Sequence, residues 1–262
     1  MSLLWKNELR LRVGPRHSEA SIWRAGVQTR CAGRARVAGH HQAAVEEVLG
    51  VLVAEGHVLP DAASMCVDDE YLYYTTLPAG GSWDDAQAAA VDYFAEKVGE
   101  QNLLVETSLA PCGRSWVAVA IDAALVVGWR ETLAVLDVRL GQVRAALFED
   151  LWTLRDDMSL DDGVAVVIRS EGAMLVGLHA GCITDLAWER CNVADPEAIA
   201  ARVQGYSARL SEQLGIAGTP GELPVFVVPA DAAQHALIRP LASSLGWRLG
   251  AALFESETSV SA

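Results

Sequence analysis

Lysine is nearly absent from this chain, and its scarcity excludes one large class of nucleotide site. Lys6 and Lys97 are the two lysines among 262 residues, and neither follows a glycine-rich turn. A P-loop needs such a lysine to reach the β- and γ-phosphates. The sequence also has neither the G-x-G-x-x-G pattern of dinucleotide-binding folds nor the G-x-S-x-G pattern of serine hydrolases. All three routes to cofactor binding or catalysis are therefore excluded.

Long apolar runs are missing as well. The most apolar stretch, Trp116 to Trp129, is interrupted by Asp122 and is shorter than the roughly 18 residues that a membrane helix needs. The N-terminus lacks the layout of a signal peptide. A net charge of −14 argues against a nucleic-acid-binding surface and against direct attraction to an anionic membrane. We therefore expect a cytoplasmic protein that is held at a membrane, if at all, by a partner.

The cysteines are few for the length of the chain and odd in number. They are scattered along the sequence, at Cys31, Cys66, Cys112, Cys182 and Cys191. This spacing predicts free thiols in a reducing compartment and not a disulfide framework. His179, Cys182 and Cys191 fit no standard zinc spacing and have no evident fourth ligand, so no metal site is predicted. Cys112 lies beside Arg114, a pattern typical of an ordinary hairpin turn.

The segments that remain predict an α/β fold in which one unit occurs twice. The chain is 52% hydrophobic and 21% charged, which allows a substantial core in one large domain or two joined ones. Residues 9–31 have the alternation of three short strands, and a helix is expected at 41–55. Residues 163–190 repeat the three strands, and Pro196 begins a helix expected to reach residue 214. The repeated element order indicates a pseudo-duplicated fold.

The segment between the repeats predicts an inserted subdomain. Its expected order over 71–144 is strand, helix, strand, strand, helix, strand, and Asp84 or Asp85 could cap the first helix. A buried strand at 223–228, a helix at 232–245 and a strand at 248–254 complete the second repeat. We therefore expect a first subdomain over 1–70, an inserted one over 71–145, a second repeat over 146–254 and a flexible tail over 255–262.

This layout resembles the actin-like proteins of bacterial pilus and type II secretion assembly, namely PilM, the cytoplasmic part of GspL, and MshI. The resemblance in element order covers roughly residues 9–254, and its diagnostic stretches are Met65-Cys66-Val67, Leu77-Pro78, Asp92-Tyr93-Phe94, Leu103 to Leu109, and Trp116 to Ile121. It implies a duplicated, ribonuclease H-like actin fold with an insertion. It also implies a position on the cytoplasmic side of the inner membrane. The implied partner is a membrane-anchored assembly protein, bound through a short cytoplasmic peptide, together with other assembly components.

Three junctions stand where an actin-like ATPase would hold its nucleotide, and each departs from that chemistry. Such an enzyme needs a carboxylate after the first strand for Mg²⁺ or water, and glycines that let backbone N–H groups approach phosphates. The first junction offers Arg12, Gly14 and Pro15, and the second has Arg169 where an aspartate is expected. The third, after Val228, has Pro229-Ala230 in place of a glycine pair. ATP and Mg²⁺ are therefore disfavoured, and any residual nucleotide would contact Gly14, Arg169 and Gly172.

Candidate partner-binding residues lie in the inserted segment. Trp83 follows a glycine-rich loop and precedes Asp84, and Tyr73 lies in the strand before that loop. An exposed aromatic side chain at a loop tip is a suitable interface anchor. The acidic segment 148–162 is either a solvated helix and loop or a receptor for a basic peptide.

Taken together, the residues favour a non-catalytic cytoplasmic adaptor of a type IV pilus or type II secretion-like assembly. One alternative is an actin-like ATP-binding protein or weak ATPase of the same machinery. Another is an unrelated α/β protein that binds a small molecule.

Overall fold

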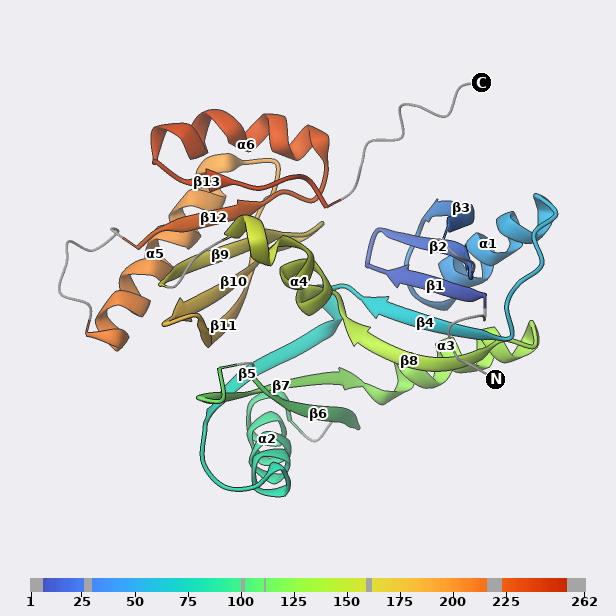
Figure 1. Cartoon of the computed structure of the whole chain (residues 1–262), viewed down its shortest axis with the longest axis horizontal. Helices are drawn as coiled ribbons and strands as arrows, with labels where there is room; N and C mark the ends of the chain where they lie inside the picture. The colour runs from blue at the N-terminus through green and yellow to red at the C-terminus, as the bar shows by residue number, and fades with distance from the viewer. Residues whose placement is uncertain are drawn as a thin grey trace. The chain divides into compact units, whose positions relative to one another are not determined.

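The protein is an α/β molecule whose computed structural model describes residues 7–25, 30–99, 102–110, 112–158, 162–215 and 223–253 (Figure 1). It holds two five-stranded sheets and one three-stranded sheet. Two compact units account for the chain: Met1–Leu72, Glu100–Leu104 and Ile121–Ala146 form the first, and Tyr73–Gly99, Val105–Ala120 and Leu147–Ala262 form the second. Within the described residues, no helix is long and apolar enough to cross a membrane.

The first unit is built on a mixed sheet in the order β3-β2-β1-β4-β8. Its elements are β1 (Glu8–Val13), β2 (His17–Arg24), β3 (Arg30–Ala38), α1 (His41–Ala54), β4 (Ala62–Val67), a 3₁₀ turn (Asp69–Tyr71), α3 (Ala123–Val135) and β8 (Arg139–Ala145). Strands β1, β2 and β3 form an antiparallel meander, and β4 runs parallel to both β1 and β8. Leu9, Leu11 and Val13 are buried, as their alternation predicts.

The second unit repeats this arrangement in the order β11-β10-β9-β12-β13. Its elements are α4 (Ala146–Met158), β9 (Gly163–Ile168), β10 (Gly172–His179), β11 (Cys182–Arg190), α5 (Pro196–Leu214), β12 (Val225–Val228), α6 (Ala232–Ser244) and β13 (Arg248–Leu249). Strands β9, β10 and β11 are again an antiparallel meander, and β12 runs parallel to β9. The predicted duplication is therefore confirmed. The third strand of the first meander extends to Ala38, well past the expected end of the three strands at residue 31, because the buried alternation continues through Ala35 and Val37.

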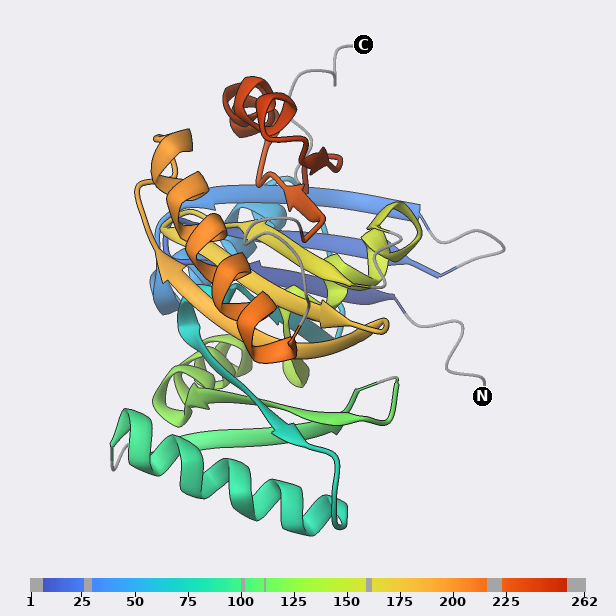
Figure 2. The same cartoon turned by 90° about the vertical axis from the view of Figure 1, so that its left-hand side faces the viewer.

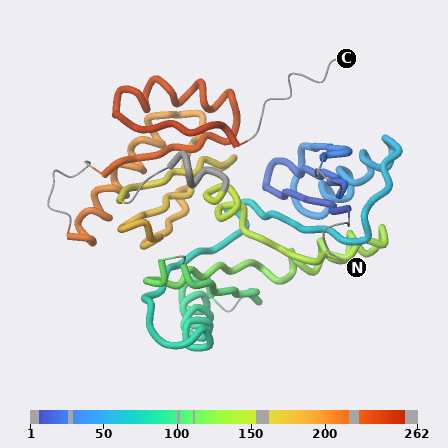
Figure 3. Tube along the Cα trace, in the orientation of Figure 1, coloured from blue at the N-terminus to red at the C-terminus, as the bar shows by residue number. Residues whose placement is uncertain are grey.

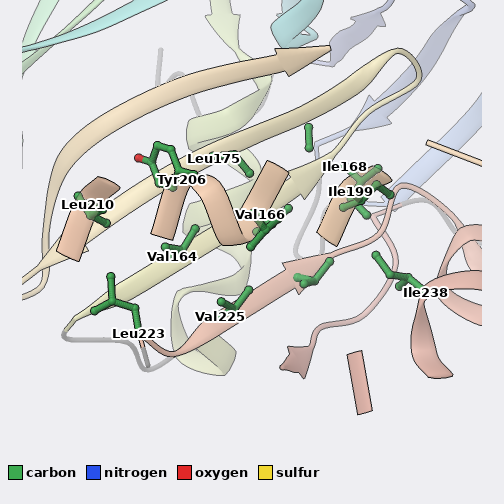
Figure 4. Packing of buried hydrophobic residues seen from close by; sticks show 13 residues of the cluster. Val164, Val166, Ile168, Leu175, Ile199, Tyr206, Leu210, Leu223, Val225 and Ile238 are labelled. Carbon is green, nitrogen blue, oxygen red and sulfur yellow. The ribbon is translucent and has the colours of Figure 1, made fainter. Parts of the chain in front are cut away.

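The sheet of the second unit carries a hydrophobic core on each face. Helix α5 lies across one face (Figure 2), where Tyr206 and Leu210 pack on Val164 and Val166 (Figure 4). Helix α4 supplies Leu147 to the core on the other face. Strand β9 is buried from end to end because both of its faces are covered, so it reads as a continuous apolar run.

The three-stranded sheet has the order β5-β7-β6 and is accompanied by helix α2. Its elements are β5 (Leu72–Pro78), α2 (Trp83–Val98), β6 (Leu103–Leu109) and β7 (Ser115–Asp122). The N-cap of α2 is Ser82, which forms a capping box with Asp85, so neither Asp84 nor Asp85 is the cap as the sequence suggested.

The structure divides the middle of the chain differently from the expected 71–145 subdomain. The Cα trace (Figure 3) passes from the three-stranded sheet into α3 and β8. Both of these elements belong to the first unit, whereas α2 and most of the three-stranded sheet group with the second. The expected tail at 255–262 lies outside the described residues.

A disulfide and two hydroxyl groups join the three-stranded sheet to strand β11. Cys112, in the β6–β7 turn, is bonded to Cys182 across a Cα–Cα distance of 5.6 Å. The Ser115 hydroxyl donates to the Ile183 carbonyl at 2.8 Å, and the Thr76 hydroxyl donates to the Thr184 carbonyl at 3.0 Å. The expectation of free thiols is therefore wrong for Cys112 and Cys182. Their 70-residue separation hides the pairing from any local pattern.

We expect this disulfide to stabilise the oxidised protein. Closing a loop of this length lowers the entropy of the unfolded chain by an amount worth about 4 kcal/mol. Cys112→Ser should therefore lower the free energy of unfolding measured by denaturant titration without reductant, and adding reductant to the wild type should reproduce the loss. Cys191→Ser removes a free, half-buried thiol and serves as the control. Alkylation of both Cys112 and Cys182 in the folded, unreduced protein would contradict the bond.

Candidate functional site

At the first hairpin, an arginine and an aspartate form an ion pair within the first unit. Arg12 lies on β1, and Asp68 directly follows the parallel strand β4. The Arg12 Nε donates to Asp68 Oδ1 at 2.9 Å, and both side chains are largely buried. The acidic residue that the ATPase pattern lacks on β1 is thus supplied by the residue after the neighbouring strand β4, where it neutralises an arginine.

Gly14 forms the turn of that hairpin, and its space is already taken. The Gly14 N–H donates to the His17 carbonyl at 3.0 Å, and the Asp68 N–H donates to the Val13 carbonyl at 2.9 Å. A Cβ atom at Gly14 would collide with Asp68 Oδ2. The Asp68 carboxylate therefore stands against the glycine where a phosphate would need to approach. Contact there is opposed both sterically and by like charge.

The second hairpin has the same chemistry with more complete burial. Arg169 follows β9, and its Nη1 donates to Asp150 Oδ2 on α4 at 2.6 Å. The two side chains are 2% and 8% exposed, respectively. Such a pair is kept because each charge compensates the other in a medium of low polarity. Arg169 is therefore engaged inside the protein and does not project toward solvent.

Gly172 is required by strand packing. Its carbonyl accepts the Arg169 N–H at 2.8 Å, which closes the β9–β10 turn. A Cβ at Gly172 would collide with the Glu189 carbonyl oxygen on β11. The neighbouring strand thus explains this glycine without any ligand. Of the three predicted nucleotide contacts, Arg169 and Gly172 share one hairpin, and Gly14 belongs to the other unit.

The third junction is closed by its own capping bonds. Asp231 is the N-cap of α6, and its side chain accepts the Gln234 N–H at 2.8 Å. The Gln234 side chain in turn accepts the Ala230 N–H at 2.7 Å. The Pro229 carbonyl accepts the Leu253 N–H at 3.0 Å. These backbone groups already have partners at the place where an ATPase would present glycines to adenosine.

Trp83 opens helix α2 and is not at the tip of a loop, as the sequence suggested. Its indole N–H donates to the Thr107 carbonyl on β6 at 3.1 Å, although the residue remains 48% exposed. One turn later, the Gln87 side chain donates to the Val105 carbonyl at 2.8 Å and accepts the Thr107 hydroxyl at 2.9 Å. Helix α2 thereby occupies two carbonyls of β6, which protects this edge strand from pairing with an added strand.

Tyr73 lies apart from Trp83. It is 40% exposed on β5, and β7 separates that strand from β6. Asp84 is exposed in the first turn of α2. The three predicted partner contacts therefore divide between two places, with Trp83 and Asp84 on α2 and Tyr73 at the opposite edge of the sheet.

Sequence reasoning missed the two aspartates that define these sites. Asp150 was one charge in the acidic segment 148–162, and Asp68 belonged to no predicted site, yet both are buried. A usable indication did exist for Asp68. The ends of parallel strands meet at one edge of a sheet, so an acid after β4 is well placed to face Arg12 on β1.

Comparison with solved structures identifies the fold. A chain of the PilM–PilN type IV pilus biogenesis complex matches with a TM-score of 0.68 and 13% identity, covering 93% of this chain and 87% of that one. A Bacteroides thetaiotaomicron protein of unknown function with an actin-like ATPase fold matches with a TM-score of 0.60 and 11% identity, over 95% and 93% of the two chains. The chain has the actin-like ATPase fold. This confirms the fold class expected from the sequence.

A weaker similarity extends to the cytoplasmic domain of EpsL, an inner-membrane component of the Vibrio cholerae type II secretion system. Its TM-score is 0.49 at 12% identity, over 84% of this chain and 81% of that one. No protein-family model matches the sequence, and no curated protein matches it.

The Arg169–Asp150 pair offers a direct test of the closed hairpin. Arg169→Met removes the buried ion-pair partner of the Asp150 carboxylate and should lower the free energy of unfolding by about 3–5 kcal/mol, measured by denaturant titration. The double variant Arg169→Met/Asp150→Leu should recover most of the loss, because neither charge then remains. Arg190→Met removes the exposed partner of Glu171 and should change stability by less than about 0.5 kcal/mol. Equal losses in the single and double variants would contradict the assignment.

Proposed function

We propose that the protein is a non-catalytic cytoplasmic adaptor of a pilus or type II secretion-like assembly. In this proposal, it holds a membrane-anchored partner through a short cytoplasmic segment of that partner, at the inner membrane. The observation that carries the proposal is the pair of arginine–aspartate contacts, Arg12–Asp68 and Arg169–Asp150, which fill the hairpins where this fold would bind a nucleotide. The similarity in fold to a chain of the PilM–PilN complex supports the choice of machinery.

The energetics disfavour nucleotide binding at the second hairpin. Recruiting Arg169 to a phosphate would break its buried ion pair with Asp150. That rearrangement costs about 3–5 kcal/mol, which weakens an affinity by two to four orders of magnitude. A weak ATP-binding role remains the second candidate, and the actin-like ATPase fold itself is the observation in its favour.

Partner binding on the three-stranded sheet is assigned to the β5 side. An extended peptide can add to a sheet edge through backbone hydrogen bonds, while pockets for alternate side chains set its specificity. Helix α2 occupies the Val105 and Thr107 carbonyls of the β6 edge. The opposite edge strand, β5, carries the exposed Tyr73. Tyr73 is therefore the first choice for a peptide contact, with Trp83 and Asp84 on α2 as a second position.

We expect millimolar ATP with Mg²⁺ to leave the melting temperature nearly unchanged in a thermal-shift experiment. A ligand present at about 100 times its Kd would stabilise the fold by about 2.7 kcal/mol, so even weak binding would be visible. ADP and Mg²⁺-free ATP provide matched controls for ionic strength. A rise that grows with ATP concentration and requires Mg²⁺ would establish the second candidate. Variants of Arg169 and Gly172 are unsuitable as probes here, because both residues support the fold.

The adaptor role is tested by binding to synthetic cytoplasmic tails of membrane proteins encoded by neighbouring genes. One tail should bind, and Tyr73→Ala should weaken its affinity about tenfold, a loss of about 1.4 kcal/mol that is typical of an aromatic anchor. Leu237→Ala removes a comparably exposed side chain from α6 and should have no effect. If no tail binds the folded protein, the adaptor proposal fails. If a tail binds but the two variants behave alike, the β5 assignment alone is wrong.

A further inference from the structure

Positive charge is concentrated in one short part of this acidic protein. Residues 8–38 contain seven arginines and two glutamates, whereas the whole chain has a net charge of −14. These nine residues are Arg10, Arg12, Arg16, Arg24, Arg30, Arg34, Arg36, Glu8 and Glu19. The same segment forms the β1-β2-β3 meander. The remainder of the chain is therefore more acidic than the net charge indicates.

Strand register gathers many of these arginines on one face of the first sheet. Residues paired across neighbouring strands share a face, so Arg10 lies in line with Ser21 and Arg34, and Arg12 with Glu19 and Arg36. Neighbouring strands lie about 4.8 Å apart, which places Arg10 and Arg34 about 10 Å from each other at the backbone. In the direction of β4 and β8, and on the same face, Arg12 lies in line with Cys66 and Arg144. We call the set Arg10, Arg12, Arg34, Arg36 and Arg144 the basic face.

The buried residues of β1 point to the other side of this sheet. Leu9 and Leu11 alternate with Arg10 and Arg12 along the strand. Helix α1 contacts the meander through that other side, and its apolar residues Val45 and Leu49 are fully buried. The basic face is thus the side of the meander that its own helix leaves uncovered.

Local contacts orient Arg10 and Arg34 without burying them, whereas Arg12 is largely buried. Arg10 pairs with Glu8 at 2.9 Å and stacks over the Trp23 ring at 4.9 Å, and the Trp23 indole donates to the Ser21 hydroxyl at 3.0 Å. Arg34 pairs with Glu19 at 3.1 Å. The Arg10 and Arg34 side chains are still 51% and 59% exposed. A guanidinium has five N–H donors, so one carboxylate partner does not exhaust it.

The positive charges of this face shift the pKa values of two neighbouring residues, His17 and Glu8. Burial lowers the pKa of His17, and Arg36 and Arg12 lower it further, against an opposing effect of Asp68. Burial raises the pKa of Glu8, but hydrogen bonds from Ser64 and Arg10 and the charges of Arg10 and Arg144 outweigh it, so this pKa is lowered. The face therefore acts on nearby groups as a net positive surface, despite its own glutamates.

We propose that the basic face binds a short acidic segment of a protein partner. Guanidinium groups match carboxylates through paired N–H donors, and their orientation by Trp23, Glu8 and Glu19 limits the ordering that binding requires. The size of the occupant follows from the charge distribution. From β3 to β8 the face is about 19 Å across, roughly two Debye lengths of about 8 Å at physiological salt. A segment of a few acidic residues fits within this face. A long polyanion or an anionic bilayer would extend beyond it and be repelled by the acidic surface of the rest of the chain.

This inference does not depend on the proposed adaptor role. It concerns a face of the first unit, whereas Tyr73 lies on β5 in the second. Loss of tail binding in Tyr73→Ala and loss of acidic-peptide binding in an arginine variant are separate outcomes. Either can fail without the other.

The test is fluorescence anisotropy with a dye-labelled hexaglutamate peptide, with hexaglutamine carrying the same dye as the reference. Hexaglutamate should bind the full chain at low ionic strength, and its affinity should fall as salt increases. Arg10→Ser/Arg34→Ser should weaken binding on the order of fivefold. The control Arg130→Ser/Arg239→Ser removes the same charge from exposed positions on α3 and α6 and should weaken it less than twofold.

Three results would overturn the proposal. Hexaglutamate could bind no better than hexaglutamine, or the control variant could lose as much affinity as the face variant, which would assign binding to net charge alone. A 20-nucleotide oligothymidylate or phosphatidylglycerol vesicles could bind more tightly than hexaglutamate through the same arginines, which would replace the acidic segment with a polyanion or a membrane.

Unchanged melting curves confirm that each variant is folded, and Arg36→Ser provides a second face variant if Arg10→Ser/Arg34→Ser is unstable.

Discussion

The buried Arg169–Asp150 ion pair is the constraint on which the second unit depends. Arg169 leaves a strand that is covered on both faces, so its charge cannot reach water and must be met inside the protein. Helix α4 supplies Asp150, whose carboxylate forms an ion pair with Arg169. The pair thereby fixes a charged contact between α4 and the β9–β10 hairpin. Neither residue can change alone without removing the other's buried ion-pair partner.

Arg12 and Asp68 give the first unit a related, less deeply buried arrangement. In both units an arginine at the end of the first strand faces an aspartate from another element. The duplicated fold thus has the same kind of ion pair at both hairpins. In the adaptor role that we propose, the binding surfaces lie elsewhere, on the β5 edge and on the basic face.

Much of the fold was predictable because its determinants are local. Alternation in β1, the continuous apolar run of β9, and Pro196 at the start of α5 each specify their element within a few residues. The contacts of the candidate sites were less accessible, because they join residues far apart in the chain. Asp68 lies 56 residues from Arg12. Trp83 was expected at a loop tip for a related reason: it opens α2, and its indole N–H donates to a carbonyl on β6 that lies 24 residues away.

The Cys112–Cys182 bond has a consequence for how the chain would carry a pulling force. The loop that it closes contains α3, β8 and α4, and so includes part of the first unit. Tension applied between the two ends of the oxidised chain would pass through the sulfur atoms and bypass residues 113–181. Residues 113–181 would carry the pulling force once the disulfide is reduced, and they would not carry it while the disulfide is intact. The thiol state would thus decide which segments of the chain bear force.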